Sequence, residues 1–217
     1  MIGVVVPAHD EEALIGRCLT ALQAAASHPD LRGEPVQILV VLDACTDRSA
    51  AIVAGAGVEA LTVDVRNVGL GRGAGAAQLI ARGARWLAFT DADSEVAADW
   101  LARQAESASD AVCGVVAVDD WGEHGVDVRA RYEAGYVDAD GHRHVHGASM
   151  GVSTAAYLRA GGFPPLRCSE DVGLIDQLTF VGASICWTNR VRVRTSARRV
   201  ARAPDGFATH LARLGDG

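Results

Sequence analysis

Two aspartates one residue apart, Asp91 and Asp93, directly follow the apolar run at residues 87–90. A short apolar run that ends in polar residues is typical of a buried β-strand. Two carboxylates at such a strand end repel each other and lose hydration, so a positive charge should offset them. Their oxygens suit Mg²⁺ or Mn²⁺, and a cation there could hold a diphosphate and neutralise a departing phosphate group. The pair therefore predicts a divalent-metal site.

Polar side chains also follow the other apolar runs of the first hundred residues. The runs lie at residues 2–7, 37–43, 61–65 and 85–91, and the side chains at their ends belong to His9, Asp10, Glu11, Asp43, Asn67, Asp91 and Asp93. Segments with helical spacing separate these runs, at residues 11–25, 47–54 and 73–84. Strands that alternate with helices predict a mostly parallel sheet covered by helices on both faces, with ligands at the carboxyl ends of the strands. Any one of these acids could instead cap a helix or form a turn, but the whole set favours a shared site.

The pattern is less regular after Trp100. A polar stretch at residues 119–146 is expected to form a loop or a weakly periodic helix. Within it, the alternating histidines His142, His144 and His146 are expected to lie on an exposed strand. The other expected elements are a strand at 111–118, a short strand and a helix within 146–163, a helix at 169–178 and a last strand at 183–188. No repeat or linker marks a boundary, so we expect a single domain over residues 1–217, with a loosely held tail at 203–217.

A glycine-rich stretch, NVGLGRGAGAAQ at residues 67–78, lies between an expected strand and helix. Gly71, Gly73 and Ala76 fit a relaxed dinucleotide-binding pattern, but that pattern usually follows the first strand, and here three strands precede it. The stretch could instead cradle phosphates, because glycines let backbone N–H groups approach a diphosphate and Arg72 can contact its oxygens. A flexible turn with an exposed arginine is the third alternative.

The overall composition excludes some functions. The 217 residues are 49% hydrophobic and carry a formal net charge of −7, which argues against binding nucleic acid through general electrostatics. Arg190, Arg192 and Arg194 alternate, which indicates either the solvated face of a strand or an anion-contacting edge. Five scattered cysteines without a CxxC pair fit free thiols in a reducing cytoplasm. No apolar run approaches the roughly 18 residues of a membrane span, so we expect a cytoplasmic protein that could still work at a membrane surface.

Read in order, several of these motifs resemble family 2 glycosyltransferases with a GT-A fold. They are VVVPAHDEEALIGRCL, VVLDACTDRSA, the glycine stretch with Arg72, FTDADS, HGASMGVS and GGFPPLRCSEDVGLIDQL, and they cover roughly residues 2–200. The resemblance implies a single GT-A domain, with a nucleotide-sugar-binding half at residues 1–100 and an acceptor-side half at residues 101–200.

The resemblance also implies roles for individual residues. Pro7, Ala8, His9 and Glu11 would line the pocket for the base and ribose, and Asp43 would accept a hydrogen bond from the base. Gly71 and Arg72 would lie at the donor phosphates. Asp91 and Asp93 would form the metal-binding DxD motif, with Asp93 the direct ligand and Asp91 nearer the ribose. Glu170 and Asp171 would face the acceptor, with Asp171 as the general base.

The sequence thus predicts a glycosyltransferase that uses Mn²⁺ or Mg²⁺ to move a sugar from a nucleoside-diphosphate sugar to an acceptor hydroxyl. The acceptor could be a small molecule or lipid-linked, and a homodimer partner could complete its pocket. A nucleotidyltransferase is one alternative, but it would place a glycine-rich basic loop after the first strand, where this chain has PAHDEE. A non-catalytic nucleotide-sugar-binding protein is another, which the presence of Asp171 disfavours.

Overall fold

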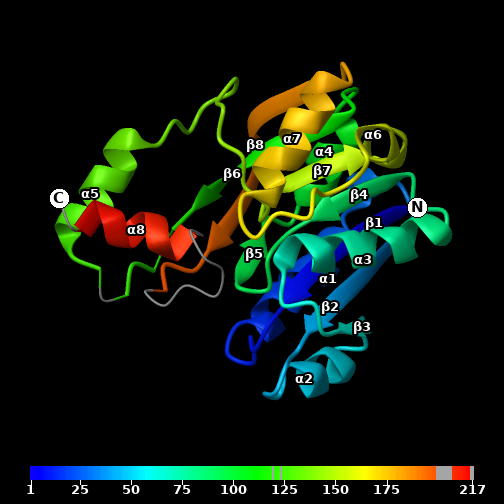
Figure 1. Cartoon of the computed structure of the whole chain (residues 1–217), viewed down its shortest axis with the longest axis horizontal. Helices are drawn as coiled ribbons and strands as arrows, with labels where there is room; N and C mark the ends of the chain where they lie inside the picture. Colours follow the sequence, from blue (N-terminus) through cyan, green and yellow to red (C-terminus); the bar gives the residue numbers. More distant parts are fainter. Residues whose placement is uncertain (119, 123, 199–206, 216–217) are drawn as a thin grey trace.

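A single mixed sheet organises the chain (Figure 1). The computed structural model describes residues 1–118, 120–122, 124–198 and 207–215. Within these residues eight strands pair in the order β3-β2-β1-β4-β7-β6-β8-β5. The strands are β1 (Ile2–Ala8), β2 (Val36–Asp43), β3 (Glu59–Val63), β4 (Trp86–Phe89), β5 (Ser94–Val96), β6 (Ala111–Ala117), β7 (Met150–Ser153) and β8 (Ile185–Thr195).

Helices cover both faces of this sheet. They are α1 (Ile15–Ala26), α2 (Ser49–Gly55), α3 (Val68–Ala81), α4 (Trp100–Glu106), α5 (Val126–Gly135), α6 (Thr154–Ala160), α7 (Glu170–Phe180) and α8 (Phe207–Gly215). Helices α1, α2 and α4 share one hydrophobic core with the sheet, and α3, α6 and α7 share the other. Side chains along β1 alternate between the two, because Val4 and Val6 enter the first core and Val5 enters the second. Burial on both faces explains why the central strands β1, β4 and β6 are almost entirely apolar.

The strand directions differ between the two halves of the sheet. β1 pairs in parallel with β2 and β4, and β2 with β3. β7 then runs antiparallel between β4 and β6, and β8 is parallel to β6 but antiparallel to β5. The α/β class and the mostly parallel, helix-covered sheet expected from the sequence are therefore confirmed.

Several local expectations need correction. The helix expected at residues 73–84 begins earlier, at Val68, so Gly69 and Gly71 also lie in α3 and not in a loop before it. The alternating histidines do not form an exposed strand, because residues 142–146 carry no strand and His142 is buried. The last strand is longer than expected and extends to Thr195, so the alternating arginines lie on β8. They pair there with Glu106, Asp138 and Glu95.

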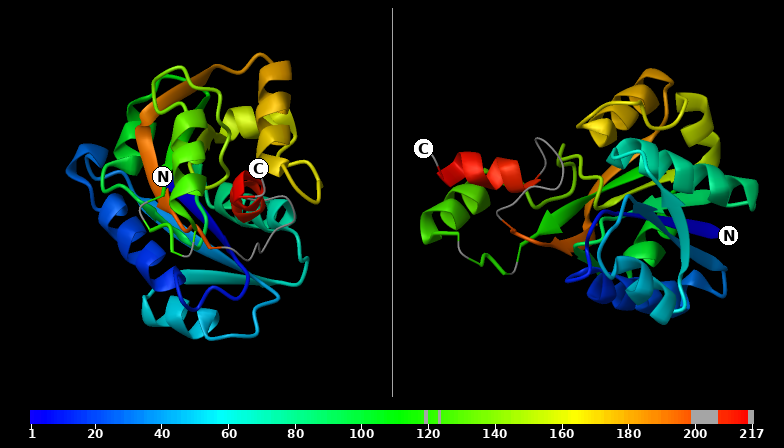
Figure 2. Two further views of the ribbon diagram at one scale, coloured as in Figure 1. Left: turned by 90° about the vertical axis from the view of Figure 1, so that its left-hand side faces the viewer. Right: turned by 60° about the horizontal axis from the view of Figure 1, so that its bottom comes forward.

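Two helices stand apart from the sheet and pack on each other. Figures 1 and 2 show α5 and α8 side by side, at the outer ends of the segments that follow β6 and β8. A small separate core joins them, in which Trp121, Val128 and Tyr132 contact Leu211, which is fully buried. The polar stretch at 119–146 thus contains a helix. Of the tail expected at 203–217, residues 207–215 form α8, and residues 203–206 and 216–217 lie outside the described residues.

None of the described helices combines the length and apolar character that crossing a bilayer requires.

Candidate active site

A cavity of about 780 Å³ opens at the carboxyl ends of β1, β2 and β4 and continues to the start of α7. Asp10 does not line this cavity, whereas every residue to which the family resemblance gives a role does: Pro7, Ala8, His9, Glu11, Asp43, Gly71, Arg72, Asp91, Asp93, Glu170 and Asp171. They come from the ends of three strands, β1, β2 and β4, from the first two turns of α3 and from the start of α7. The parallel strand order brings the first group together, because the carboxyl ends of parallel strands meet at one edge of the sheet.

Asp43 anchors the loop after β3 to the end of β2. Its carboxylate accepts backbone N–H groups from Val65 at 2.8 Å, Arg66 at 2.9 Å and Asn67 at 3.0 Å. The side chain is nearly buried, and three of the roughly four acceptor positions of a carboxylate are used by these bonds. His9 Nδ1 lies 2.7 Å from the backbone carbonyl oxygen of Asp43. The floor of this part of the cavity is therefore fixed, with one acceptor position of Asp43 left for a ligand.

Arg72 connects the two sides of the cavity. Its guanidinium is buried and forms ion pairs with both Asp91, after β4, and Glu170, at the start of α7. Burial lowers the pKa of Arg72, but the charges of Asp91, Glu170 and Asp171 outweigh it and raise the pKa overall, so the group is cationic. The guanidinium lies against the backbone of Gly147, where a side chain would collide with it. Only glycine leaves room for this arginine.

The helical position of the glycine stretch changes its expected role. Gly71 N–H donates to the carbonyl oxygen of Asn67 at 2.9 Å, so this donor is used within the helix and does not cradle a phosphate. Gly75 is instead needed for close packing, because a Cβ there would lie 2.7 Å from Val5 and 2.8 Å from Val41. A contact between Arg72 and donor phosphates stays a prediction.

Asp93 lies in a charged pair that the sequence did not reveal. Arg198 Nη2 lies 2.7 Å from Asp93 Oδ2, and Arg198 Nη1 donates to both carboxylate oxygens of Glu11, at 2.7 and 2.8 Å. Burial and the neighbouring charge of Asp91 raise the pKa of Asp93 to about 6, although Arg198 opposes them. Arg198 follows an arginine run whose alternation indicates a strand face or an anion-contacting edge, and no local motif links it to Asp93.

The aspartate pair fits a divalent cation. Arg72 and Arg198 each bridge two carboxylates, those of Asp91 with Glu170 and of Asp93 with Glu11, so four formal negative charges face two positive ones. Burial is the first cause of the raised pKa of Asp93, and the negative charge of Asp91 adds to it. Mg²⁺ typically takes one or two carboxylates and completes its coordination with phosphate oxygens and water. Asp91 and Asp93 would supply such carboxylates.

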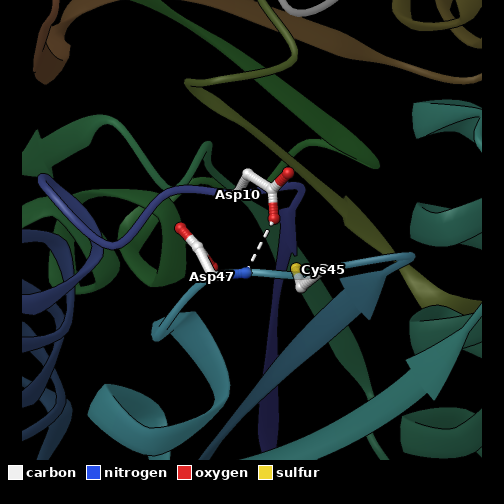
Figure 3. Close-up of side chains that lie close together, drawn as sticks. All are labelled: Asp10, Cys45 and Asp47. Atoms are coloured by element: carbon white, nitrogen blue, oxygen red, sulfur yellow. Dashed lines mark hydrogen bonds between the residues drawn. The ribbon is translucent and has the colours of Figure 1, made fainter.

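A second acidic group lies between the loops that follow β1 and β2 (Figure 3). Ligand atoms of Asp10, Cys45 and Asp47 all lie within 4.8 Å of one another, close enough for one metal ion to reach them. However, Asp10 Oδ1 accepts the N–H groups of Thr46 at 2.7 Å and Asp47 at 3.2 Å, and Asp47 accepts the N–H of Glu12 at 2.8 Å. These bonds join the loop after β1 to the loop after β2, so both carboxylates have a structural role that needs no metal.

One wall of the cavity is built at the start of α7. Asp171 Oδ2 accepts the N–H of Gly147 at 2.7 Å, and Oδ1 accepts the N–H of Val172 at 2.8 Å. Glu170 beside it is buried, and burial raises its pKa against the opposing charge of Arg72. Both acids lie in the first turn of α7, where the helix dipole favours negative charge. Asp171 is thus held in a fixed orientation at the cavity wall.

Aromatic rings line the neighbouring wall. His144 stacks on Tyr136 with ring centroids 4.2 Å apart, and the Tyr136 hydroxyl lies 3.0 Å from His146 Nε2. Val116 N–H donates to the same hydroxyl at 2.9 Å, so the hydroxyl proton is free to point to His146. The histidines therefore belong to a packed aromatic stack.

The sequence of this chain matches a known protein family. The model of glycosyl transferase family 2 matches residues 3–159, well over half of the chain. The chain belongs to glycosyltransferase family 2. The matched residues of this family 2 chain include Asp43, Arg72, Asp91 and Asp93, whereas Glu170, Asp171 and Arg198 lie beyond them.

Solved structures share the fold. S. aureus TarS in complex with UDP-GlcNAc is similar at a TM-score of 0.69 and 17% identity, over 98% of this chain and 64% of that one. The mannosyltransferase PcManGT from Pyrobaculum calidifontis, in complex with GDP-Man and Mn²⁺, is similar at a TM-score of 0.65 and 17% identity, over 97% and 68%. At these identities the likeness shows the GT-A fold. The search of curated proteins found no match.

Proposed function

We propose that this chain transfers a sugar from a nucleoside-diphosphate sugar to an acceptor hydroxyl, with Mn²⁺ or Mg²⁺ held by Asp91 and Asp93. The observation that carries the proposal is the shared cavity, which the aspartate pair and Asp171 both line and in which Arg72 pairs with Asp91 and with Glu170, the neighbour of Asp171. Family membership supports a glycosyltransferase over a nucleotidyltransferase. Two fold neighbours were solved with UDP-GlcNAc and with GDP-Man and Mn²⁺, which supports a nucleotide-sugar donor.

The residues divide the work along the cavity. Pro7, Ala8, His9 and Glu11 bind the nucleoside, and Asp43 accepts a hydrogen bond from its base. The cation, when bound, neutralises charge on the diphosphate as it leaves. Arg72 pairs with both Asp91 and Glu170, and so fixes the position of the start of α7 relative to the donor side of the cavity. Much of the rate then comes from the alignment of the two substrates.

Asp171 removes the acceptor proton in this proposal. The acceptor oxygen attacks the anomeric carbon, the bond from that carbon to the diphosphate oxygen breaks, and the acceptor proton passes to the Asp171 carboxylate. The N–H groups of Gly147 and Val172 hold that carboxylate in place. A general base must lie within hydrogen-bond reach of the proton, about 3 Å, so a fixed side chain is required. The acceptor, small or lipid-linked, and a homodimer stay predictions.

A thermal-shift panel tests the proposal. The full chain is heated with UDP, GDP or dTDP, with and without Mn²⁺, and with the matching nucleoside monophosphates as controls. A ligand present at a hundred times its Kd stabilises a protein by about 2.7 kcal/mol, which raises the midpoint of a domain of this size by roughly 5–10 °C. We expect this rise with one diphosphate only when Mn²⁺ is present. No rise with any of them would refute the donor assignment.

A further inference from the structure

Arg198 joins two nearly buried acids at the donor end of the cavity. It follows β8, and its side chain is 26% exposed, whereas the side chains of Asp93 and Glu11 are 12% and 7% exposed. Three contacts between 2.7 and 2.8 Å hold the guanidinium between the two carboxylates. Arg198 is therefore an interior partner of both acids.

The contact to Asp93 uses the carboxylate that a metal would need. Arg198 Nη2 contacts Asp93 Oδ2, and the Ser94 hydroxyl donates to Asp93 Oδ1 at 3.2 Å. Both carboxylate oxygens of Asp93 therefore already have donors. A divalent cation would approach such an oxygen to about 2.1 Å. Two positive groups on one poorly hydrated carboxylate repel each other strongly, because little solvent screens them.

We propose that Arg198 is an internal counter-ion that occupies Asp93 in the donor-free protein and that an incoming divalent cation must displace from it. The inference rests on the proposed function, because it takes Asp93 to be a metal ligand. Glu11 keeps Arg198 close by after the exchange, since it binds the guanidinium through both of its oxygens. Nucleotide-free protein then binds the metal weakly, because the metal competes with a tethered guanidinium for the same carboxylate.

Titration of Mn²⁺ into nucleotide-free full-length protein, followed by the loss of the free-ion EPR signal, measures this competition. We expect Arg198→Gln to bind Mn²⁺ about three to ten times more tightly than the wild type, the range that loss of one partly exposed charged contact produces. Arg194→Gln is the matched control, because Arg194 lies on the same segment and pairs with Glu95, two residues from Asp93. Its Mn²⁺ affinity should stay within about twofold of the wild type, which separates direct displacement from general charge.

Arg198→Lys sharpens the result. Lysine keeps the charge but cannot bridge two carboxylates as the planar guanidinium does, so its Mn²⁺ affinity should fall between those of the wild type and Arg198→Gln. Equal or weaker Mn²⁺ binding by Arg198→Gln overturns the proposal. If neither the wild type nor the variant binds Mn²⁺ without nucleotide, the role of Arg198 is also refuted, because its removal should expose the carboxylate. The proposed function fails only if the thermal-shift panel also shows no Mn²⁺-dependent rise.

A crystal structure of the wild type with Mn²⁺ and the diphosphate selected by the thermal-shift panel gives a second test that does not depend on how the variants fold. With Mn²⁺ on Asp93, Arg198 Nη2 should have left hydrogen-bond distance of Asp93 Oδ2, from 2.7 Å here to beyond about 3.5 Å. Mn²⁺ on Asp93 with the arginine still in contact would show that no displacement occurs.

Discussion

The half of this molecule that we propose binds the donor and the half that we propose binds the acceptor are built in different ways. In the donor half, β1 to β4 form a parallel sheet in which each strand ends at the cavity, so residues near each other in sequence deliver their side chains to one edge. In the acceptor half, β7 runs antiparallel and β8 pairs with β5 and β6, which precede it by many residues. Donor chemistry is therefore placed by local strand endings, and acceptor chemistry by long-range pairing. The variants below test the site residues of each half, the independence of the α5–α8 pair and the packing of α3.

The largest effect is expected from Asp93→Ala in the donor half. Loss of the metal ligand should lower kcat/KM by about a thousandfold and remove Mn²⁺-dependent nucleotide binding, because the leaving group loses its charge stabilisation. Steady-state kinetics and the thermal-shift assay measure the two effects. Asp99→Ala, which removes a partly exposed carboxylate that pairs with Arg103, is the control and should change neither. Unchanged activity in Asp93→Ala would remove the metal role.

Asp171→Asn should slow transfer by at least about a hundredfold, because an amide cannot take the acceptor proton. Nucleotide affinity should stay at the wild-type value, since the amide oxygen of the variant side chain can still accept the Gly147 N–H and the donor half is left intact. Single-turnover kinetics and nucleotide titration separate the two quantities. Asp176→Asn changes an exposed acid on the same helix and serves as the control. If transfer and binding both survive in Asp171→Asn, the base assignment is wrong.

Leu211→Ala tests whether the α5–α8 pair is an independent unit. Leu211 is fully buried between these helices, and removal of a buried leucine side chain costs about 2–5 kcal/mol. Hydrogen exchange should accelerate in α5 and α8, while the strands of the donor half keep their protection. Arg213→Ala, on the exposed side of α8, is the comparison variant. Equal acceleration in β1 and β2 would show that the two regions unfold together.

The smallest effects concern two glycines of α3 that differ in their surroundings. A Cβ on Gly75 would lie 2.7 Å from Val5 and 2.8 Å from Val41, whereas a Cβ on Gly73 meets nothing within 4 Å. Gly75→Ala should lower the free energy of unfolding by about 1–2 kcal/mol, because the cost of overpacking against Val5 and Val41 exceeds the gain in helix propensity. Gly73→Ala should raise it by about 0.5–1 kcal/mol. Urea denaturation measures both free energies of unfolding. If both variants changed the free energy of unfolding in the same direction, the packing argument would be contradicted.

The sequence predicted the donor half better than the acceptor half for a physical reason. Alternating strands and helices fix which ends converge, so Asp43, Asp91 and Asp93 could be assigned to one site without any contact information. Arg198 could not be assigned, because its partner Glu11 lies 187 residues away and no spacing rule links them. The cytoplasmic location stays a prediction.

The glycine stretch shows how tertiary packing overrides propensity. Glycine disfavours helices, and the helix was expected to begin only at residue 73, after Gly69 and Gly71, whereas α3 begins at Val68. In the structure, Gly75 packs against β1 and β2, and Gly69 lies so close to Glu170 that a Cβ there would come within 2.9 Å of its side chain. One local signal did mark the start of α3, since the Asn67 side chain caps the helix through the N–H of Leu70 at 2.9 Å. α5 was ambiguous because it buries only Val128 and Tyr132, against a helix from the far end of the chain.

The Arg72 bridge limits how this scaffold could be adapted to new acceptors. Its guanidinium ties the strand that carries Asp91 to the helix that carries Glu170, so a change in the pitch or position of α7 would be transmitted to the donor carboxylate. The α5–α8 pair has its own core, and its link to the aspartates runs through Ala197 in that core and the next residue, Arg198, which pairs with Asp93. Engineering of acceptor preference should therefore graft or diversify that outlying pair and preserve the residues at positions 72, 91, 147 and 170 as an invariant frame.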